Sequence, residues 1–283
     1  ILLLTIKSII ILKKRKIDKI FSTGGYMSLP LIIAGKILNL DIFLTEPNHV
    51  LGRANKFFLK SCKKIFCYTD QVKNFPKKFQ DKIIIIKPLV RKHFYKVNSS
   101  LKKRNKFTIL IVGGSQGASI FDKDLKNIIL NISEKNLIKV FQQTGKKNIS
   151  KLSNFYSKNN IENEIFNFNE NFLDILKETD LCITRAGAST LAELSVLNIP
   201  FVAVPLPTSK DNHQFENANF YKSNGSCWMI EQNDFAEKIE ECLRNIIEKK
   251  SDYIRKKENL RKLNFQNSWI NVNQKIIKIL NEN

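Results

Sequence analysis

The stretch with the clearest chemical potential is LCITRAGASTLAELS, residues 181–195. It runs from apolar residues through small and hydroxyl-bearing residues into a segment of helical character. A helix that begins among small residues leaves backbone N–H groups unpaired, and such groups bind anions, phosphate above all. The stretch therefore predicts an anion site. The structural alternative is an ordinary helix start, in which Glu193 only complements the helix dipole.

Two further glycine turns, STGGY at 22–26 and GGSQGA at 113–118, follow predicted strands. Neither is G-x-G-x-x-G or G-x-x-x-x-G-K-[ST], so neither indicates a dinucleotide or ATP. Each alone is typical of a tight turn between strand and helix, and Arg185 alone fits an ordinary surface cation. Polar residues recur after several strands, and this favours a nucleotide-binding site over a set of unrelated turns. Ser115, residues 188–190 and Gln214 all follow predicted strand ends of one sheet.

The composition indicates a folded, strongly basic protein. Of the 283 residues 43% are hydrophobic, and 47 Lys and Arg against 26 Asp and Glu give a net charge of +21. Such charge favours acidic partners, namely nucleic acid, anionic lipid or phosphorylated substrates, although lysines scattered by compositional bias would give the same total. Five cysteines without a second C-x-x-C, and only three histidines, favour reduced buried thiols over a zinc site.

The N-terminal segment ILLLTIKSIIILKKRK, residues 1–16, predicts an amphipathic helix. Its apolar run of about 12 residues is shorter than the roughly 20 residues that a membrane span needs. Its basic residues follow the apolar run, whereas a signal peptide carries them first. An apolar face followed by KKRK is typical of a helix lying on anionic lipid, with a core-facing helix as the alternative.

The elements that position these turns form two similar halves. Short apolar runs alternate with helical periods from residue 17 to 90, and again from 107 onward, which predicts two parallel sheets flanked by helices. The polar residues 94–106 fit a linker. We expect an N-terminal domain at 1–93, a C-terminal domain at 107–262 and a final helix at 263–283 that packs back on the N-terminal domain.

Seven segments in sequence order make the chain resemble the MurG family of N-acetylglucosaminyltransferases. They are GGYMSLP (24–30), EPN (46–48), PLVR (88–91), GGSQGA (113–118), QTG (143–145), TRAGASTLAEL (184–194) and DNHQFENA (211–218). The resemblance covers nearly the whole chain. It implies an α/β GT-B fold of two Rossmann-like, doubly wound domains facing a cleft. It also implies inverting transfer of N-acetylglucosamine from UDP-N-acetylglucosamine to the C4 hydroxyl of lipid I, making lipid II for the cell wall.

The resemblance also implies roles for individual residues. Glu193 would accept hydrogen bonds from the ribose hydroxyls of UDP, and the helix start would hold the diphosphate. The full expected donor set is Asn48, Arg91, Ser115, Asn169, Ala188, Ser189, Thr190, Leu191, Ala192, Glu193 and Gln214. The expected turn for the acceptor diphosphate contains Gly24, Gly25, Tyr26 and Ser28. We expect no metal and no cofactor.

The chain departs from the family at its N-terminus. The family's glycine-rich GGTGGH-like loop, with its proposed histidine base, has no counterpart here, so we expect an incomplete N-terminal domain and poor transfer by this chain alone. We assign no general base, although His49 and His213 lie near matching motifs. The resemblance implies peripheral attachment to the cytoplasmic face of the bacterial inner membrane, and no nucleic acid partner. A UDP-N-acetylglucosamine 2-epimerase and a noncatalytic UDP-sugar-binding module remain open alternatives.

Overall fold

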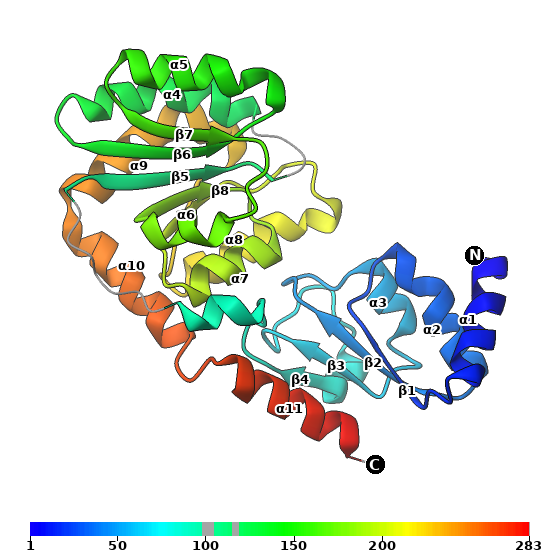
Figure 1. Cartoon of the computed structure of the whole chain (residues 1–283). Coiled ribbons are helices and arrows are strands. Elements are labelled where there is room, and N and C mark those ends of the chain that lie inside the picture. Colours follow the sequence, from blue (N-terminus) through cyan, green and yellow to red (C-terminus); the bar gives the residue numbers. More distant parts are fainter. Residues whose placement is uncertain (98–104, 115–118, 283) are drawn as a thin grey trace. The chain divides into compact units, whose positions relative to one another are not determined.

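The chain folds into two compact units. The computed structural model describes residues 1–97, 105–114 and 119–282. Unit 1 comprises Ile1–Leu89, Lys210–Glu216 and Gln266–Asn283, and unit 2 comprises Val90–Ser209 and Asn217–Phe265. Figure 1 shows the strands and helices of each unit.

Unit 1 contains a four-stranded parallel sheet in the order β1-β2-β3-β4. Its strands are β1 (Lys19–Ser22), β2 (Asp41–Glu46), β3 (Lys64–Cys67) and β4 (Ile83–Ile85). Its helices are α1 (Leu2–Lys14), α2 (Leu29–Ile37), α3 (Arg53–Phe58) and α11 (Trp269–Asn281), with 3₁₀ turns η1 (Tyr26–Ser28) and η2 (Lys77–Lys82).

The sheet of unit 1 is covered on both faces. Ile42 and Leu44 of β2 pack with Ile32 of α2 and Phe58 of α3 on one face. Between them in sequence, Phe43 points to the opposite face, where it packs with Val272 and Ile276 of α11. The alternation follows from the two-residue period of a strand. The final helix therefore packs on the N-terminal sheet.

Unit 2 contains a six-stranded parallel sheet in the order β10-β9-β8-β5-β6-β7. Its strands are β5 (Phe107–Val112), β6 (Ile138–Gln143), β7 (Glu162–Phe166), β8 (Leu181–Thr184), β9 (Phe201–Ala203) and β10 (Trp228–Met229). Its helices are α4 (Ser119–Ser133), α5 (Ile149–Lys158), α6 (Phe172–Glu178), α7 (Ala188–Val196), α8 (His213–Ser223, whose first residues belong to unit 1), α9 (Phe235–Glu248) and α10 (Lys250–Leu263).

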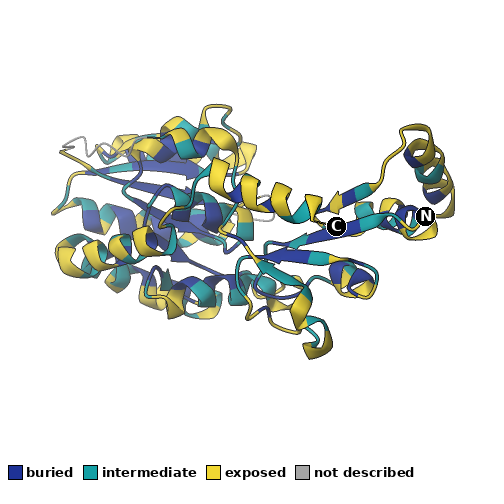
Figure 2. Cartoon of the chain, turned by 90° about the horizontal axis from the view of Figure 1, so that it is seen from below, coloured by how far each residue is buried: buried dark blue, intermediate teal, exposed yellow. Residues whose placement is uncertain are grey.

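Helices cover both faces of this sheet, which explains why its strands are almost continuously apolar. On one face, Ile109 and Ile111 of β5 pack with α4, α5 and α9. On the other, Leu110 and Val112 pack in the core that includes residues of α6, α7, α8 and α10. Figure 2 shows the central strands buried and the outer helix surfaces exposed.

The unit boundaries differ from the expected domain limits in two places. The expected linker, residues 94–106, is not polar throughout its described part, because Phe94, in the 3₁₀ turn η3 (Lys92–Lys96), is 1% exposed and lies in the core of unit 2. The segment Lys210–Glu216 lies within the range expected for the C-terminal domain but groups with unit 1. We call residues 210–216 the strap.

Helix α1 exposes most of its apolar side chains. Leu2, Leu3 and Ile10 are 77%, 65% and 60% exposed, whereas Leu12 is buried against Ile20 and Ala34. Figure 2 shows this exposed surface beside the N-terminus. None of the helices in the described part of the chain has both the length and the apolar character to cross a bilayer.

Candidate donor and acceptor sites

In unit 2 the strand order reverses between β5 and β8, and the loops that follow these two strands diverge. Val112 at the end of β5 pairs in register with Thr184 at the end of β8. The chain then continues into Gly113-Gly114 on one side and into residues 185–187, which lead to α7, on the other. Open parallel sheets bind ligands at such a switch point, beyond the carboxyl ends of the strands.

The start of α7 has the unpaired backbone donors that were expected of an anion site. Gly187 is the N-cap and no side chain caps the helix, so the N–H groups of Ala188, Ser189 and Thr190 have no intrahelical partners. The N–H of Leu191 donates to the carbonyl of Gly187 at 3.0 Å and is therefore not available.

Leu191 and Ala192 belong to the expected donor set, but both side chains are buried in the core of unit 2. The structure thus brings Ala188, Ser189 and Thr190 to the site as backbone donors, with hydroxyls on the last two. Leu191 and Ala192 hold the helix against the sheet.

Glu193 and Arg91 meet beside this helix start. A terminal guanidinium nitrogen of Arg91 lies 3.2 Å from Oε1 of Glu193, and the guanidinium lies 4.8 Å from the Phe94 ring centroid. Glu193 is half-buried, and burial raises the pKa of its carboxyl although Arg91 acts in the opposite direction. Both residues were expected to bind donor, but their pairing was not predicted because they lie 102 positions apart.

Arg185 is anchored behind the strand ends. Its guanidinium donates to Oε1 of Gln232 at 2.7 Å and to the carbonyl of Val204 at 3.3 Å, and lies over the ring of Phe121. Burial lowers the pKa of this guanidinium, which remains charged at neutral pH. These contacts hold a positive charge at the end of β8.

Asp122, which the sequence analysis did not select, fixes the start of α4. Its carboxylate accepts hydrogen bonds from Gln142 at 2.9 Å, Thr144 at 2.6 Å and Asn148 at 2.9 Å. These contacts tie α4 to the end of β6 and the start of α5. Their signal in the sequence is weak, because one acid in a helix's first turn also occurs for dipole reasons alone.

Ser115 and Asn169 also belong to the expected donor set. Ser115 lies outside the described residues. Asn169 follows the edge strand β7, two strands from β5, and its side chain is occupied. It donates to Oε1 of Glu164 at 2.9 Å and accepts from the N–H of Asn171 at 2.7 Å.

Unit 1 contains a pocket of about 600 Å³ that brings together all four expected acceptor residues or their neighbours. Gly24, Gly25 and Tyr26 line it directly, and the Ser28 hydroxyl donates to the carbonyl of Gly25 at 2.8 Å. Gly24 and Gly25 have φ angles of +75° and +83°, which favour glycine. We call this cavity the glycine-turn pocket.

Glu46 is the buried centre of this pocket, and it was not among the predicted site residues. It is 2% exposed and accepts hydrogen bonds from both nitrogens of Asn48, from the Gly52 N–H at 2.7 Å and from Asn55 at 2.9 Å. The amide oxygen of Asn55 is buried without a hydrogen-bond partner, and a Cβ on Gly24 would lie 2.8 Å from it. The expected donor residue Asn48 is therefore found in this cluster.

The strap forms one wall of the glycine-turn pocket. Lys210, Asp211 and His213 line it. Asp211 accepts three hydrogen bonds from the guanidinium of Arg53, at 2.9 to 3.2 Å, and Glu216 pairs with Lys73. Gln214 lies in the same strap, so the structure groups this expected donor residue with unit 1 and not with α7.

The two histidines near matching motifs have different surroundings. His49 is 7% exposed, and burial lowers its pKa to about 4, so it is neutral and a weak base at pH 7. His213 is more exposed, and its Nδ1 donates to the carbonyl of Lys210 at 2.7 Å. Among the described residues, no group of three His, Cys, Asp or Glu side chains could hold a metal ion.

Comparison with known proteins agrees with this architecture. Residues 2–67 match the glycosyltransferase family 28 N-terminal domain, and residues 108–271 match the glycosyltransferase family 28 C-terminal domain. A solved structure of Acinetobacter baumannii MurG aligns with a TM-score of 0.78 and 23% identity, covering 97% of this chain and 77% of that one. The fold and the two domain matches thus define a GT-B glycosyltransferase of family 28.

Curated relatives identify the particular group. A transferase of Pelagibacter ubique is 49% identical over 281 residues, which cover 99% of this chain and 79% of the relative. A transferase of Rickettsia canadensis is 36% identical over 236 residues, which cover 82% of this chain and 67% of the relative. Both are named UDP-N-acetylglucosamine–N-acetylmuramyl-(pentapeptide) pyrophosphoryl-undecaprenol N-acetylglucosamine transferase. The chain belongs to this family, the MurG family.

A UDP-N-acetylglucosamine 2-epimerase of Neisseria meningitidis, solved with UDP-N-acetylglucosamine bound, shares the fold. Its TM-score is 0.69 at 13% identity, covering 99% of this chain and 80% of that one.

Proposed function

We propose that the chain transfers N-acetylglucosamine from UDP-N-acetylglucosamine to the C4 hydroxyl of the N-acetylmuramyl residue in lipid I, giving lipid II. The observation that carries the proposal is the start of α7, where three backbone N–H groups lack intrahelical partners just after β8, the strand beside the switch point, and Glu193 follows one turn later. A nucleotide sugar needs both a diphosphate site and an acceptor for ribose hydroxyls.

The donor is held mainly by unit 2 in this proposal. The diphosphate takes hydrogen bonds from the backbone of 188–190 and from the hydroxyls of Ser189 and Thr190, and Glu193 accepts from the ribose. Arg91 contributes charge beside Glu193. The remaining members of the expected donor set are Ser115, Asn48, Asn169, whose backbone would contact uracil, and Gln214, which would contact the amino sugar.

The chemistry is a direct displacement that inverts the anomeric carbon. The C4 hydroxyl oxygen forms the new bond to that carbon, the bond to the diphosphate breaks, and UDP leaves with the electron pair. Negative charge grows on the diphosphate as it departs, so fixed N–H donors and the anchored Arg185 stabilise the transition state more than the ground state. The hydroxyl proton passes to a base that we do not assign. His49 is unsuited to that role, because burial holds its pKa near 4.

The acceptor diphosphate binds in the glycine-turn pocket of unit 1. Gly24 and Gly25 allow the backbone to approach a ligand closely, and Tyr26 and Ser28 follow at its rim. Glu46 is fully occupied by hydrogen bonds from Asn48, Gly52 and Asn55, so its role is to hold the pocket walls in place.

Membrane attachment at the cytoplasmic face is assigned to α1. Its exposed leucines and isoleucines are followed by Lys13, Lys14 and residues 15–16, a combination suited to anionic lipid. In this proposal the partners of the basic residues are the phosphates of membrane lipid and of the donor, and no nucleic acid partner is proposed.

A radiolabel transfer assay tests the function. The chain, and the chain extended at its N-terminus by a glycine-rich GGTGGH-like segment, are given labelled UDP-N-acetylglucosamine with and without lipid I. We expect label in a lipid product only when lipid I is present, and faster transfer by the extended chain, since general-base assistance typically contributes about 10²- to 10⁴-fold.

Other outcomes would overturn the proposal. Release of the 2-epimer of the sugar without lipid I would assign an epimerase. Intact UDP binding with no transfer by either form would favour a noncatalytic UDP-sugar-binding module.

A further inference from the structure

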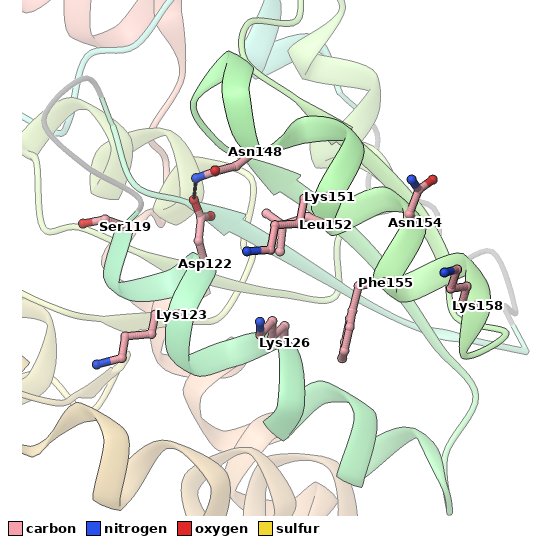
Figure 3. A pocket seen from close by; sticks show the side chains of 10 residues that line it. All are labelled: Ser119, Asp122, Lys123, Lys126, Asn148, Lys151, Leu152, Asn154, Phe155 and Lys158. Carbon is pink, nitrogen blue, oxygen red and sulfur yellow. Dashed lines mark hydrogen bonds between the residues drawn. The ribbon is translucent and has the colours of Figure 1, made fainter.

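A second cavity, of about 570 Å³, lies between α4 and α5 on unit 2 (Figure 3). We call it the α4–α5 pocket. Four lysines line it, Lys123 and Lys126 from α4 and Lys151 and Lys158 from α5. None of the residues expected to bind donor or acceptor lines this cavity, although Asp122, which fixes the start of α4, does.

The positive charge of this pocket is uncompensated. None of the four lysines forms an ion pair within the described part of the chain. The one acidic residue that lines the pocket is Asp122, and three hydrogen bonds from neighbouring side chains already occupy its carboxylate. Lys151 and Lys158 are seven residues apart on one helix, about 10 Å along its axis. Their charges therefore attract an anion to the surface of α5 between them.

The floor of the pocket is apolar. Leu152 is 3% exposed, and the ring of Phe155 lies beneath the ammonium group of Lys126, 5.6 Å from it. Figure 3 shows the Phe155 side chain extending between the two helices, near Lys126. A soluble phosphate would use only the lysines. A ligand that uses the whole pocket carries an anionic group and an apolar group together.

The type of cation narrows the anion further. Lysine is a flexible point charge, whereas arginine offers a planar fork suited to two-point recognition of a phosphomonoester or carboxylate. A pocket whose cations are all lysines suits a phosphate group, which point charges bind without a fixed fork. Each lysine near anionic lipid contributes about 1 kcal/mol.

We propose that the α4–α5 pocket binds the headgroup of an anionic phospholipid, with the phosphodiester at the lysines and the first acyl carbons on Phe155 and Leu152. This inference rests on the proposed function in one respect, because a lipid-linked acceptor brings the protein to a phospholipid surface. It gives unit 2 its own lipid contact, separate from that of α1 in unit 1.

The test uses dihexanoyl phosphatidylglycerol below its micelle concentration, so that no bilayer is needed. Amide NMR shifts should change within residues 119–133 and 149–158. The Lys126→Gln/Lys151→Gln variant should bind about 25-fold more weakly, about 5-fold per lysine. The matched Lys249→Gln/Lys250→Gln variant, which removes two exposed lysines from another part of unit 2, should change affinity less than about 2-fold.

Three comparisons separate this ligand from others. Dihexanoyl phosphatidylcholine should bind far more weakly, because its headgroup has no net charge. Glycerol phosphate should bind more weakly because it lacks the acyl carbons, and Phe155→Ser should reduce the affinity for phosphatidylglycerol towards that of glycerol phosphate. Equal binding of glycerol phosphate and phosphatidylglycerol would overturn the proposal in favour of free phosphate. Displacement of the lipid by a short oligonucleotide at lower concentration would assign nucleic acid.

Equal losses in the two double-lysine variants would also overturn the proposal, because the effect would then be one of overall charge. UDP titration of the Lys126→Gln/Lys151→Gln variant separates a failure of the lipid proposal from a failure of the proposed function. We expect its UDP affinity to match that of the unchanged chain. Absence of UDP binding in both would count against the proposed function and leave the lipid result standing.

Discussion

At the residue scale, some site residues could be predicted from sequence motifs, whereas the contacts between distant residues could be seen only in the folded chain. Glu193 and the small residues before it were predicted because a helix start has a local signature in sequence. The Arg91–Glu193 pair and the Glu46–Asn55 contact were not predicted, since each depends on where two separate elements come to lie. Asn55 carries no signal of its own, because an asparagine in a helix is usually solvated.

Burial of His49 predicts an acid-sensitive stability. The unfolded chain takes up a proton at this imidazole near pH 6.5, whereas the folded protein does so only near pH 4. The free energy of unfolding should therefore fall as pH drops from about 6.5 to 4, by up to roughly 3 kcal/mol from this group. Denaturant unfolding at several pH values should show a shallower acid limb for His49→Leu.

The control for this prediction is His93→Gln, which changes an exposed histidine and should leave the acid limb unchanged. Identical limbs for the unchanged chain and His49→Leu would show that folding does not lower the pKa of His49.

At the element scale, apolar strands and the turns that end them were predictable, because strands buried on both faces are continuously apolar. Helices α5, α9 and α10 are not among the elements predicted from the sequence. Helix α9 did carry a signal: Phe235, Ile239, Leu243 and Ile246 are spaced for one buried face among charged residues. The strap could not have been assigned to unit 1, since its contacts with Arg53 and Lys73 join residues more than 140 positions apart.

The Arg53–Asp211 pair should hold the strap in place. Asp211 has φ of +52°, a conformation that Asn also tolerates, so Asp211→Asn removes the charge without new strain. Hydrogen exchange of residues 210–216 should become faster in Arg53→Ala and in Asp211→Asn. The double variant should exchange no faster than either single variant, because both changes remove the same interaction.

Lys63→Ala removes the separate Lys63–Asp41 pair in unit 1 and should leave the strap's exchange unchanged. Additive acceleration in the Arg53 and Asp211 double variant would show that the two residues act independently.

At the scale of the whole molecule, the sequence predicted two α/β halves, and the order β10-β9-β8-β5-β6-β7 confirms a doubly wound sheet in the second. Family membership adds the GT-B class. The exact division of the chain was beyond the sequence, since a short segment such as Lys210–Glu216 leaves one unit for the other without a change in composition.

The proposed membrane attachment concerns the whole chain, with α1 as its expected anchor. Leu3→Asp and Ile10→Asp replace exposed apolar side chains, so they should weaken cosedimentation with phosphatidylglycerol vesicles without unfolding unit 1. Binding of the unchanged chain should fall with added salt and with neutral lipid. Phe168→Asp, which alters a 78% exposed residue of unit 2, serves as the control. Binding indifferent to lipid charge and to salt would favour a packing role for the exposed face of α1.

Calorimetric titration of UDP into the chain and into Glu193→Ala tests the central claim, that the start of α7 and Glu193 form the donor site. A hydrogen bond to a charged group contributes about 1.5–3 kcal/mol, so the variant should bind UDP about 10- to 150-fold more weakly. Glu258→Ala, which removes an exposed carboxylate from α10, should bind UDP as the unchanged chain does. Equal UDP affinity in the unchanged chain and Glu193→Ala would contradict the account, because the ribose would then be held elsewhere.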